Sequence, residues 1–146
     1  MSVEIERKFL VHVDRLPPLP APEHFQQGYL CVDPVVRVRL AVAPGGEERG
    51  ELTVKGKGLL RRAEFNIPVP ARDAEEMLGL CSRRLSKLRH RLGRWEIDRF
   101  PDLGLWLAEI ELAAEDEPFE RPAWLGEEVT ADPAYSNARL ATPAGT

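Results

Sequence analysis

The sequence lacks the features that mark several large classes of protein. Its 146 residues include only two cysteines and three histidines, and neither residue type stands at zinc-ligand spacing. Cys31 and Cys81 lie fifty residues apart and are expected as two buried thiols, without a disulfide framework. No stretch approaches the eighteen uncharged apolar residues that a membrane-spanning helix needs, so no membrane partner is expected.

A large excess of either charge is also missing. Twenty basic and 24 acidic residues give a net charge of -4, which offers no overall attraction to nucleic acid. The N-terminus MSVEIERKFLV carries charges where a secretory signal needs an apolar run, which favours a cytoplasmic location. An apolar share of 43% excludes wholesale disorder. We expect one domain over residues 1–146, as a monomer or homodimer.

What the chain does have is alternation of polar and apolar residues with a period of two. This pattern predicts strands near residues 2–11, 28–32, 35–42, 49–56, 61–69, 83–91, 94–100 and 105–113. Short turns separate the strands, as antiparallel meanders require, and Leu92-Gly93 is predicted to lie in a tight hairpin. The predicted fold class is therefore mainly β (α+β), with eight antiparallel strands in a barrel or sandwich and a few covering helices.

A first helix is predicted between the fifth and sixth strands. Asp73 is a suitable N-cap, and Glu76 follows at capping-box spacing. Met77, Leu78 and Leu80 would then face the sheet.

A second helix is predicted near the C-terminus. Asp132 followed by Pro133 is a preferred cap and first-turn pair, and the helix would run through Tyr135 to about Ala141. The last residues, TPAGT, are expected to fray.

Seven of the predicted strands carry ionic side chains on one face and apolar side chains on the other. An antiparallel sheet with one face in water would show the same alternation. However, like charges repeat two residues apart, and side chains about 6.5 Å apart repel by roughly 2.5 kcal/mol at an effective dielectric of 20. The charged faces hold seven acids and six bases: Glu4, Glu6, Glu64, Glu96, Asp98, Glu109 and Glu111, with Lys8, Arg37, Arg39, Lys55, Lys87 and Arg89.

Such paired carboxylates and paired cations suit a ligand site. Carboxylates are hard oxygen ligands for Mg²⁺ or Mn²⁺, whereas clusters of Arg and Lys hold phosphate oxygens. A metal ion and a polyphosphate bound together would satisfy both signs. If the strands close with their charged faces inward, they enclose a wet tunnel lined by ions.

These motifs resemble the CYTH superfamily, the triphosphate tunnel metalloenzymes, and in particular its short bacterial members. Glu4-Ile5-Glu6-Arg7-Lys8 is similar to the ExExK signature of this superfamily. The similarity continues through Gln27-Gly28-Tyr29-Leu30, Val36-Arg37-Val38-Arg39, Leu52-Thr53-Val54-Lys55-Gly56, Arg62-Ala63-Glu64, Lys87-Leu88-Arg89, Trp95-Glu96-Ile97-Asp98-Arg99-Phe100, Ala108-Glu109-Ile110-Glu111-Leu112 and Glu128-Val129-Thr130, and ends in Tyr135, Asn137 and Leu140. One departure is Asn66, a neutral amide where many members have a second acid in the fifth strand.

The resemblance implies an eight-stranded antiparallel tunnel, dependence on Mg²⁺ or Mn²⁺, and a small-molecule substrate that bears a triphosphate. We expect Glu4, Glu6 and Glu111 to bind metal, with Glu109 and Asp98 as outer or second-metal ligands. Glu64 and Glu96 are expected either to join them or simply to hold Arg and Lys side chains in place. The expected phosphate ligands are Lys8, Arg37, Arg39, Lys55 and Arg89.

A proton acceptor for the attacking water is less well defined by the sequence. A Tyr29 and Lys87 pair resembles the one proposed for short triphosphatases, with a close Lys87 ammonium and a metal favouring the phenolate. Alternatively, Tyr29 is an aromatic of the tunnel wall, and a carboxylate orients a metal-bound hydroxide.

The expected reaction is metal-dependent hydrolysis of a triphosphate, inorganic tripolyphosphate foremost, by in-line attack of water. Class IV adenylyl cyclase and thiamine or nucleoside triphosphatase are alternatives that the resemblance also allows. A noncatalytic polyphosphate-binding module and an ordinary structural sheet protein are alternatives of other classes.

Overall fold

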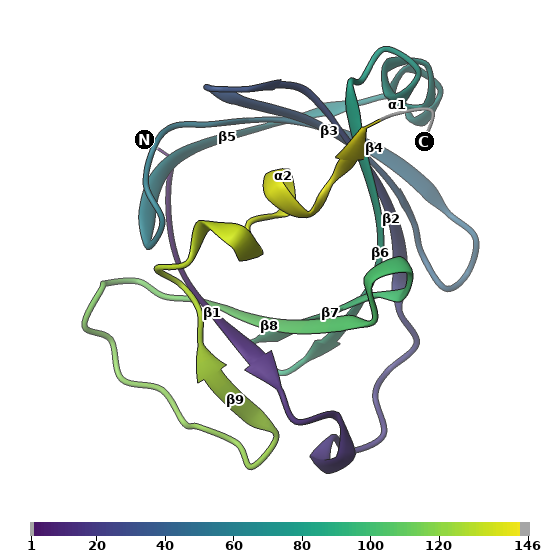
Figure 1. Ribbon diagram of the computed structural model, residues 1–146. Coiled ribbons are helices and arrows are strands. Elements are labelled where there is room, and N and C mark those ends of the chain that lie inside the picture. Colours follow the sequence, from purple (N-terminus) through teal and green to yellow (C-terminus); the bar gives the residue numbers. More distant parts are fainter. Residues whose placement is uncertain (1, 144–146) are drawn as a thin grey trace.

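A computed structural model describes residues 2–143, and within them eight antiparallel strands close into a barrel (Figure 1). Neighbours follow the order β6-β2-β3-β4-β5-β1-β8-β7, and pairing of β7 with β6 closes the ring. The predicted fold class is confirmed. The strands are β1 (Val3–Val11), β2 (Glu23–Val32), β3 (Val35–Val42), β4 (Glu48–Lys55), β5 (Arg61–Val69), β6 (Arg83–Leu92), β7 (Trp95–Phe100) and β8 (Leu105–Glu111).

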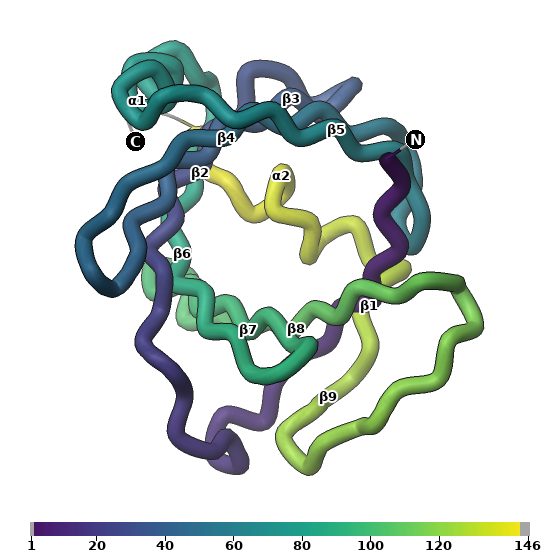
Figure 2. Tube along the Cα trace, turned by 180° about the vertical axis from the view of Figure 1, so that it is seen from behind, coloured from purple at the N-terminus to yellow at the C-terminus, as the bar shows by residue number. Residues whose placement is uncertain are grey.

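Shorter elements flank this barrel. The strand β9 (Leu125–Glu128) pairs with β1, and β10 (Thr142–Pro143) pairs with β6. The segment that carries α2 (Asn137–Leu140) projects within the ring of strands when it is seen from the front and from behind (Figures 1 and 2). The remaining elements are the helix α1 (Ala71–Leu78) and the 3-10 turns η1 (Val13–Arg15), η2 (Pro101–Leu103) and η3 (Pro133–Tyr135).

The strand β2 is longer than the sequence predicts, because it begins at Glu23 and not near residue 28. Glu23, Phe25 and Gln27 alternate as buried residues with exposed neighbours between them. Two of these three buried residues are polar, so the sequence shows no alternation of polar and apolar residues over the first part of this strand.

Apolar side chains on the outside of the barrel form the core. Phe9, Trp95 and Trp124 are buried there, and Phe119 packs against them from the loop that follows β8. Their rings meet edge to face, with centroids 5.3–5.9 Å apart. The apolar faces of β1, β7 and β8 are thus covered from outside, whereas Phe65 and Ile67 of β5 stay about half exposed, and the ionic faces line the interior.

The helix α1 covers another part of the outer wall, with Ala74 and Leu78 buried against β3. It begins at Ala71, and no side chain caps its N-terminus, so the predicted start at Asp73 was wrong. Because the helix ends at Leu78, Leu80 lies beyond it and is 76% exposed, contrary to the prediction.

The second predicted helix is broken in two. Asp132 caps η3 by accepting a hydrogen bond from the Ala134 amide, as predicted, but Ser136 has an extended backbone. The hydroxyl of Ser136 caps a new turn, α2, by accepting from the Arg139 amide, so the competing cap interrupts the helix.

Three further expectations concern the ends and the surface. Thr142 and Pro143 pair with β6 and are therefore not frayed, whereas the rest of TPAGT lies outside the described residues. Cys81 is buried as expected, but Cys31 is exposed.

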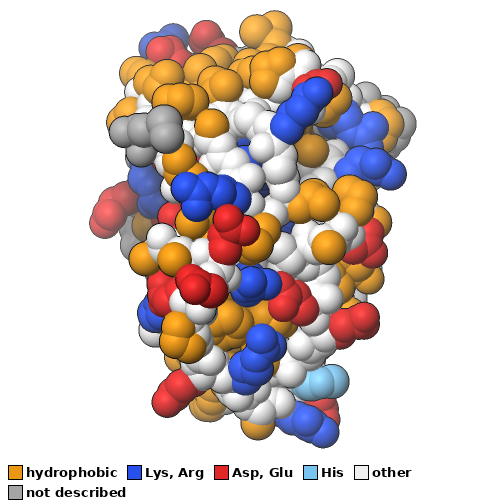
Figure 3. Space-filling view, turned by 90° about the vertical axis from the view of Figure 1, so that its left-hand side faces the viewer, with side chains coloured by type: hydrophobic (Ala, Val, Ile, Leu, Met, Phe, Trp, Pro, Cys, Tyr) orange, Lys and Arg blue, Asp and Glu red, His pale blue; other side chains and the backbone are white. Residues whose placement is uncertain are grey.

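No helix of residues 2–143 has the length and apolar character needed to cross a membrane. One outer face mixes both signs of charge with apolar side chains (Figure 3).

Candidate active site

The barrel encloses a cavity of about 640 Å³ with an ionic lining. Among the described residues that line it are eleven Lys and Arg but only seven Glu. The cavity is therefore positive by four formal charges, although the whole chain has a net charge of -4. This local excess suits an anionic ligand of several charges.

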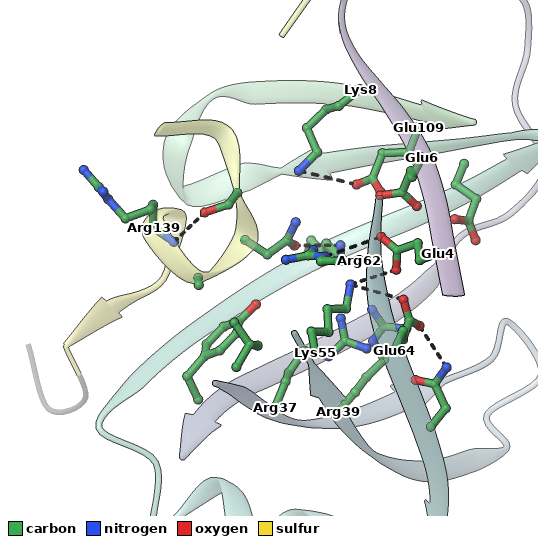
Figure 4. A pocket seen from close by; sticks show the side chains of 18 of the residues that line it. Glu4, Glu6, Lys8, Arg37, Arg39, Lys55, Arg62, Glu64, Glu109 and Arg139 are labelled. Carbon is green, nitrogen blue, oxygen red and sulfur yellow. Dashed lines mark hydrogen bonds and ion pairs between the residues drawn. The ribbon is translucent and has the colours of Figure 1, made fainter. Parts of the chain in front are cut away.

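The structure brings the predicted site residues together with one exception. Eleven of them line the cavity: Glu4, Glu6, Lys8, Tyr29, Arg37, Arg39, Lys55, Lys87, Arg89, Glu109 and Glu111. Figure 4 shows Glu4, Glu6 and Glu109 on one side of the site, facing Lys8 and Lys55. The exception, Asp98, is buried behind the lining.

Three carboxylates from neighbouring strands meet at one point of the wall. Glu6 of β1, Glu96 of β7 and Glu109 of β8 can each offer an oxygen, with all three oxygens within 4.8 Å of one another. The register of the sheet explains part of this, since Glu96 lies directly opposite Glu109, whereas Glu6 lies opposite Glu111, two residues further along β8. Three converging hard oxygen donors suit Mg²⁺ or Mn²⁺.

The electrostatics of this cluster also fit a cation. Oε1 of Glu109 is buried and makes no hydrogen bond within residues 2–143. Burial and then the charge of Glu109 hold the pKa of Glu6 well above its usual value. Burial would also raise the pKa of Glu109, but the Lys8 ammonium, 4.0 Å away, helps to hold it well below the usual value. A cation bound between the two carboxylates would relieve the repulsion that raises the pKa of Glu6.

Glu4 takes part in a separate group of ions. Nζ of Lys55 lies 3.1 Å from Glu4 and 3.6 Å from Glu64, and Nε of Arg62 lies 3.8 Å from Glu4 (Figure 4). Burial lowers the pKa of Lys55 to about 8, although the Glu4 charge opposes this shift. Glu111 lines the same cavity but is exposed, and burial and then the Glu4 charge raise its pKa.

Asp98 is held by two cations of β6. Its carboxylate accepts hydrogen bonds from Nζ of Lys87 at 2.7 Å and from Nε and Nη2 of Arg89 at 2.8 and 2.9 Å. Burial would raise the pKa of Asp98, but Arg89 and Lys87 together lower it to about 2. Both oxygens are engaged by cations of the chain, so Asp98 presents no free oxygen to the cavity.

A polar network positions the arginines of β3. Nη2 of Arg37 donates to the Thr53 hydroxyl at 3.0 Å, and that hydroxyl donates to Oδ1 of Asn66 at 2.7 Å. Nδ2 of Asn66 in turn donates to Glu64 at 2.8 Å. An amide at this position both accepts and donates, which a carboxylate cannot do. Asn66 thus links Arg37 to Glu64.

The hydroxyl of Tyr29 makes no hydrogen bond within the described part of the chain, although the side chain is 2% exposed and lines the cavity. Burial raises the pKa of Tyr29 above 10, in spite of the nearby arginines. The register places Lys87 opposite Phe25, four residues along β2 from Tyr29. Lys87 is thus not beside the Tyr29 hydroxyl, and in the protein without metal the phenol is the favoured form; the role of the pair as proton acceptor stays a prediction.

The segment with α2 is tied to the cavity by two lysines. Nζ of Lys8 donates to the Tyr135 carbonyl at 2.9 Å, and Nζ of Lys87 donates to Oδ1 of Asn137 at 2.8 Å. Arg139 of the same segment also lines the cavity, on the side away from the acids (Figure 4).

Several lining residues were not predicted as site residues. Arg49 and Arg91 line the cavity and both donate to Glu23, which lies outside the lining, and Nη2 of Arg91 also lies 3.7 Å from Glu96. Inward parity on β4 and β6 could have identified both arginines, and Arg91 also follows Arg89 two residues along the predicted strand 83–91. Glu96 was expected to hold cations, and it does lie 3.1 Å from Arg89, but it also joins the carboxylate cluster.

Known proteins similar to this chain share a common description. An inorganic triphosphatase of Acetivibrio thermocellus is 38% identical over 149 residues, which cover 96% of this chain and 94% of that protein. An inorganic triphosphatase of Nitrosomonas europaea is 36% identical over 149 residues, covering 94% and 96%. No family model matches the chain.

Solved structures agree with this likeness. A crystal structure of the inorganic triphosphatase NE1496 superposes with a TM-score of 0.62 at 32% identity, covering 97% of this chain and 95% of the other. A second crystal structure, described as the hypothetical protein NE1496, gives a TM-score of 0.63 at 34% identity, covering 94% and 97%.

Proposed function

Because this chain belongs to the inorganic triphosphatase family, within the CYTH superfamily that its motifs resemble, we propose that it hydrolyses inorganic tripolyphosphate with the aid of Mg²⁺ or Mn²⁺. Water attacks a terminal phosphorus, the phosphoanhydride bond breaks, and orthophosphate and pyrophosphate leave. The observation that carries the proposal is the ionic cavity, which combines a carboxylate cluster with an excess of cations.

We assign the metal to Glu6, Glu96 and Glu109. The converging oxygens support this choice, as does Oε1 of Glu109, which is buried without a hydrogen bond among the described residues. When bound, the cation would neutralise charge on the phosphate oxygens and favour ionisation of the attacking water. Glu4 and Glu111 line the same cavity and remain candidates for a second ion.

The phosphate chain would lie along the cations of the opposite walls. Tripolyphosphate carries about four to five negative charges near neutrality, comparable with the cation excess of the lining. Its oxygens are assigned to five cations that line the cavity, Lys8, Arg37, Arg39, Lys55 and Arg89. These contacts would stabilise both the bound substrate and the charge that develops during transfer.

Proton handling falls to Tyr29 and Lys87. The neutral phenol of Tyr29 has a free hydroxyl that can donate to a phosphate oxygen of the leaving pyrophosphate. Lys87 is fixed by Asp98 and Asn137, and its remaining N–H can face the cavity. In place of the metal role expected from the sequence, we assign Asp98 to positioning Lys87 and Arg89.

An assay of purified protein tests the proposal. The protein is incubated with Mg²⁺ or Mn²⁺ and tripolyphosphate, ATP or thiamine triphosphate, and orthophosphate and cyclic AMP are both measured. Orthophosphate from tripolyphosphate, lost on addition of a chelator, is expected. Cyclic AMP from ATP would indicate a cyclase, and tight binding without any product would indicate a binding module; either result contradicts the proposal.

Two variants make the assay specific to the cavity. Glu109→Gln changes the carboxylate cluster, whereas Glu128→Gln changes an acid on β9 that pairs with Arg7 outside the cavity lining. The first variant should lose turnover and the second should keep it. Equal activities in the two variants would show that the reaction occurs elsewhere.

A further inference from the structure

Phe25 lies beneath the cations of the cavity. It belongs to β2, where it faces the barrel interior and is fully buried, and it is absent from the cavity lining because cations cover its ring. Among residues 2–143, three cationic groups lie over this ring: the guanidinium carbon of Arg39 at 4.2 Å from the centroid, that of Arg89 at 5.1 Å and Nζ of Lys87 at 6.0 Å.

The three cations differ in how their charge is compensated. Arg89 and Lys87 both donate to Asp98 within 2.9 Å. Arg39, in contrast, has only Glu51 as a salt-bridge partner in the described chain, at 3.9 Å from Nη1. Its Nε donates to the neutral amide of Gln27 at 2.7 Å.

Apart from Glu51, whose carboxylate is 37% exposed and is shared with Arg37 at 3.6 Å, Arg39 is held by neutral groups. The face of an aromatic ring attracts a guanidinium through its quadrupole but carries no net charge. The Gln27 amide fixes the Nε end in the same way, by a hydrogen bond without neutralisation. A carboxylate in either place would fix the side chain too, but it would cancel the charge that an anion needs.

We propose that Phe25 is a positioning residue that fixes the guanidinium of Arg39 toward the cavity while leaving its charge available for a phosphate group of the substrate. The inference rests on the proposed function, since it concerns the same cavity. Burial, followed by the charges of Arg37 and Arg89, lowers the pKa of Arg39 to about 9. Its charge is therefore costly in the free protein, and binding of a polyanion would relieve that cost.

Phe25→Leu tests the proposal, because it removes the aromatic face and keeps an apolar side chain. We expect KM for tripolyphosphate to rise about tenfold while kcat changes less than about twofold, the pattern for loss of a contact made equally in the bound substrate and the transition state. Phe25→Tyr keeps the ring and should stay within about threefold of the wild-type KM. Should Phe25→Leu not fold, Phe25→Met carries the same expectation.

Phe9→Leu is the matched control. Phe9 is also fully buried and has a guanidinium over its ring, that of Arg121 at 5.4 Å, but it lies in the outer core. The same substitution there should cost stability without changing KM. If both variants raise KM alike, the effect is a general loss of packing and the proposal is overturned.

A double-mutant cycle shows whether Phe25 acts through Arg39. The dissociation constant of tripolyphosphate is measured by calorimetry in chelator, for wild type, Phe25→Leu, Arg39→Gln and the double variant. Phe25→Leu should weaken binding about tenfold in the wild type and less than about twofold in Arg39→Gln. A full tenfold effect in both backgrounds, or in neither, overturns the proposal.

The binding measurement also separates this inference from the proposed function. A wild type that binds tripolyphosphate but does not hydrolyse it would overturn the hydrolysis, and the cycle would still decide the role of Phe25. A wild type that neither binds nor hydrolyses tripolyphosphate would overturn both.

Discussion

Replacing Asp98 by Asn should destabilise the fold more than any other single loss of charge in the barrel. The carboxylate is fully buried and accepts three hydrogen bonds from Lys87 and Arg89, all between 2.7 and 2.9 Å. The amide keeps one acceptor oxygen and turns two N–H donors toward cations that also donate. Removing one partner of such a buried ion pair costs about 3–5 kcal/mol. A domain of this kind has about 5–15 kcal/mol of stability in total.

The assay is urea unfolding followed by circular dichroism, in chelator so that no metal contributes. We expect the free energy of unfolding to fall by about 3–5 kcal/mol and Tm to fall by about 6–20 °C. Asp102→Asn is the matched control, because Asp102 is exposed and its replacement should change stability by less than about 0.5 kcal/mol. A loss below about 1 kcal/mol in Asp98→Asn would refute the reasoning. It would mean that Lys87 and Arg89 do not need this carboxylate to be stable in the barrel, and Asp98 would again be a candidate metal ligand.

Three other substitutions have definite expectations. Glu109→Gln should lower metal-dependent kcat/KM by about 100-fold or more. Glu111→Gln, outside the carboxylate cluster, should lower it less than about tenfold. A larger loss in Glu111→Gln than in Glu109→Gln would contradict the assigned ligands. Glu23→Gln should lower the free energy of unfolding by about 1 kcal/mol at pH 7. Burial would raise the pKa of Glu23, but hydrogen bonds from two half-exposed arginines outweigh burial and lower it, so the ionised carboxylate stabilises the fold above the pKa that it has in the unfolded chain. In an acid titration of stability, the difference between variant and wild type should disappear as the pH falls below about 4, and a constant difference would contradict this. Gly28→Ala should lower the unfolding free energy by about 1–3 kcal/mol in urea, because the added Cβ would lie 2.4 Å from the Cys81 sulfur, and a neutral effect would show that this wall can move.

The fold was largely predictable because the period-two alternation separates an ionic face from an apolar face in most strands. The prediction was wrong where local chemistry competes with that pattern. Buried Glu23 and Gln27 conceal the first half of β2, and Ser136 interrupts a helix that Asp132 starts correctly. The strand β9 has only four residues, too few for an alternation to be recognised.

The membership of the cavity was predictable, but the partners within it were not. Inward parity is enough to place an ionic side chain in the tunnel. Which carboxylates meet, however, depends on the register between paired strands, and the register of β7 against β8 sets Glu96 opposite Glu109. Register also places Asp98 opposite Arg89. Glu96 and Asp98 lie on the same face of β7, yet Glu96 lines the cavity whereas Asp98 pairs with Arg89 and Lys87.

The central claim is that a carboxylate cluster and a set of cations inside one barrel bind metal and triphosphate together. The most direct test is anomalous diffraction from crystals soaked with Mn²⁺ and imidotriphosphate, an analogue with nitrogen at the bridging positions. We predict an anomalous peak in contact with Glu6, Glu96 and Glu109, with the phosphate groups of the analogue against Arg37 and Arg39. A peak outside the barrel, or an analogue bound away from these arginines, would contradict the account.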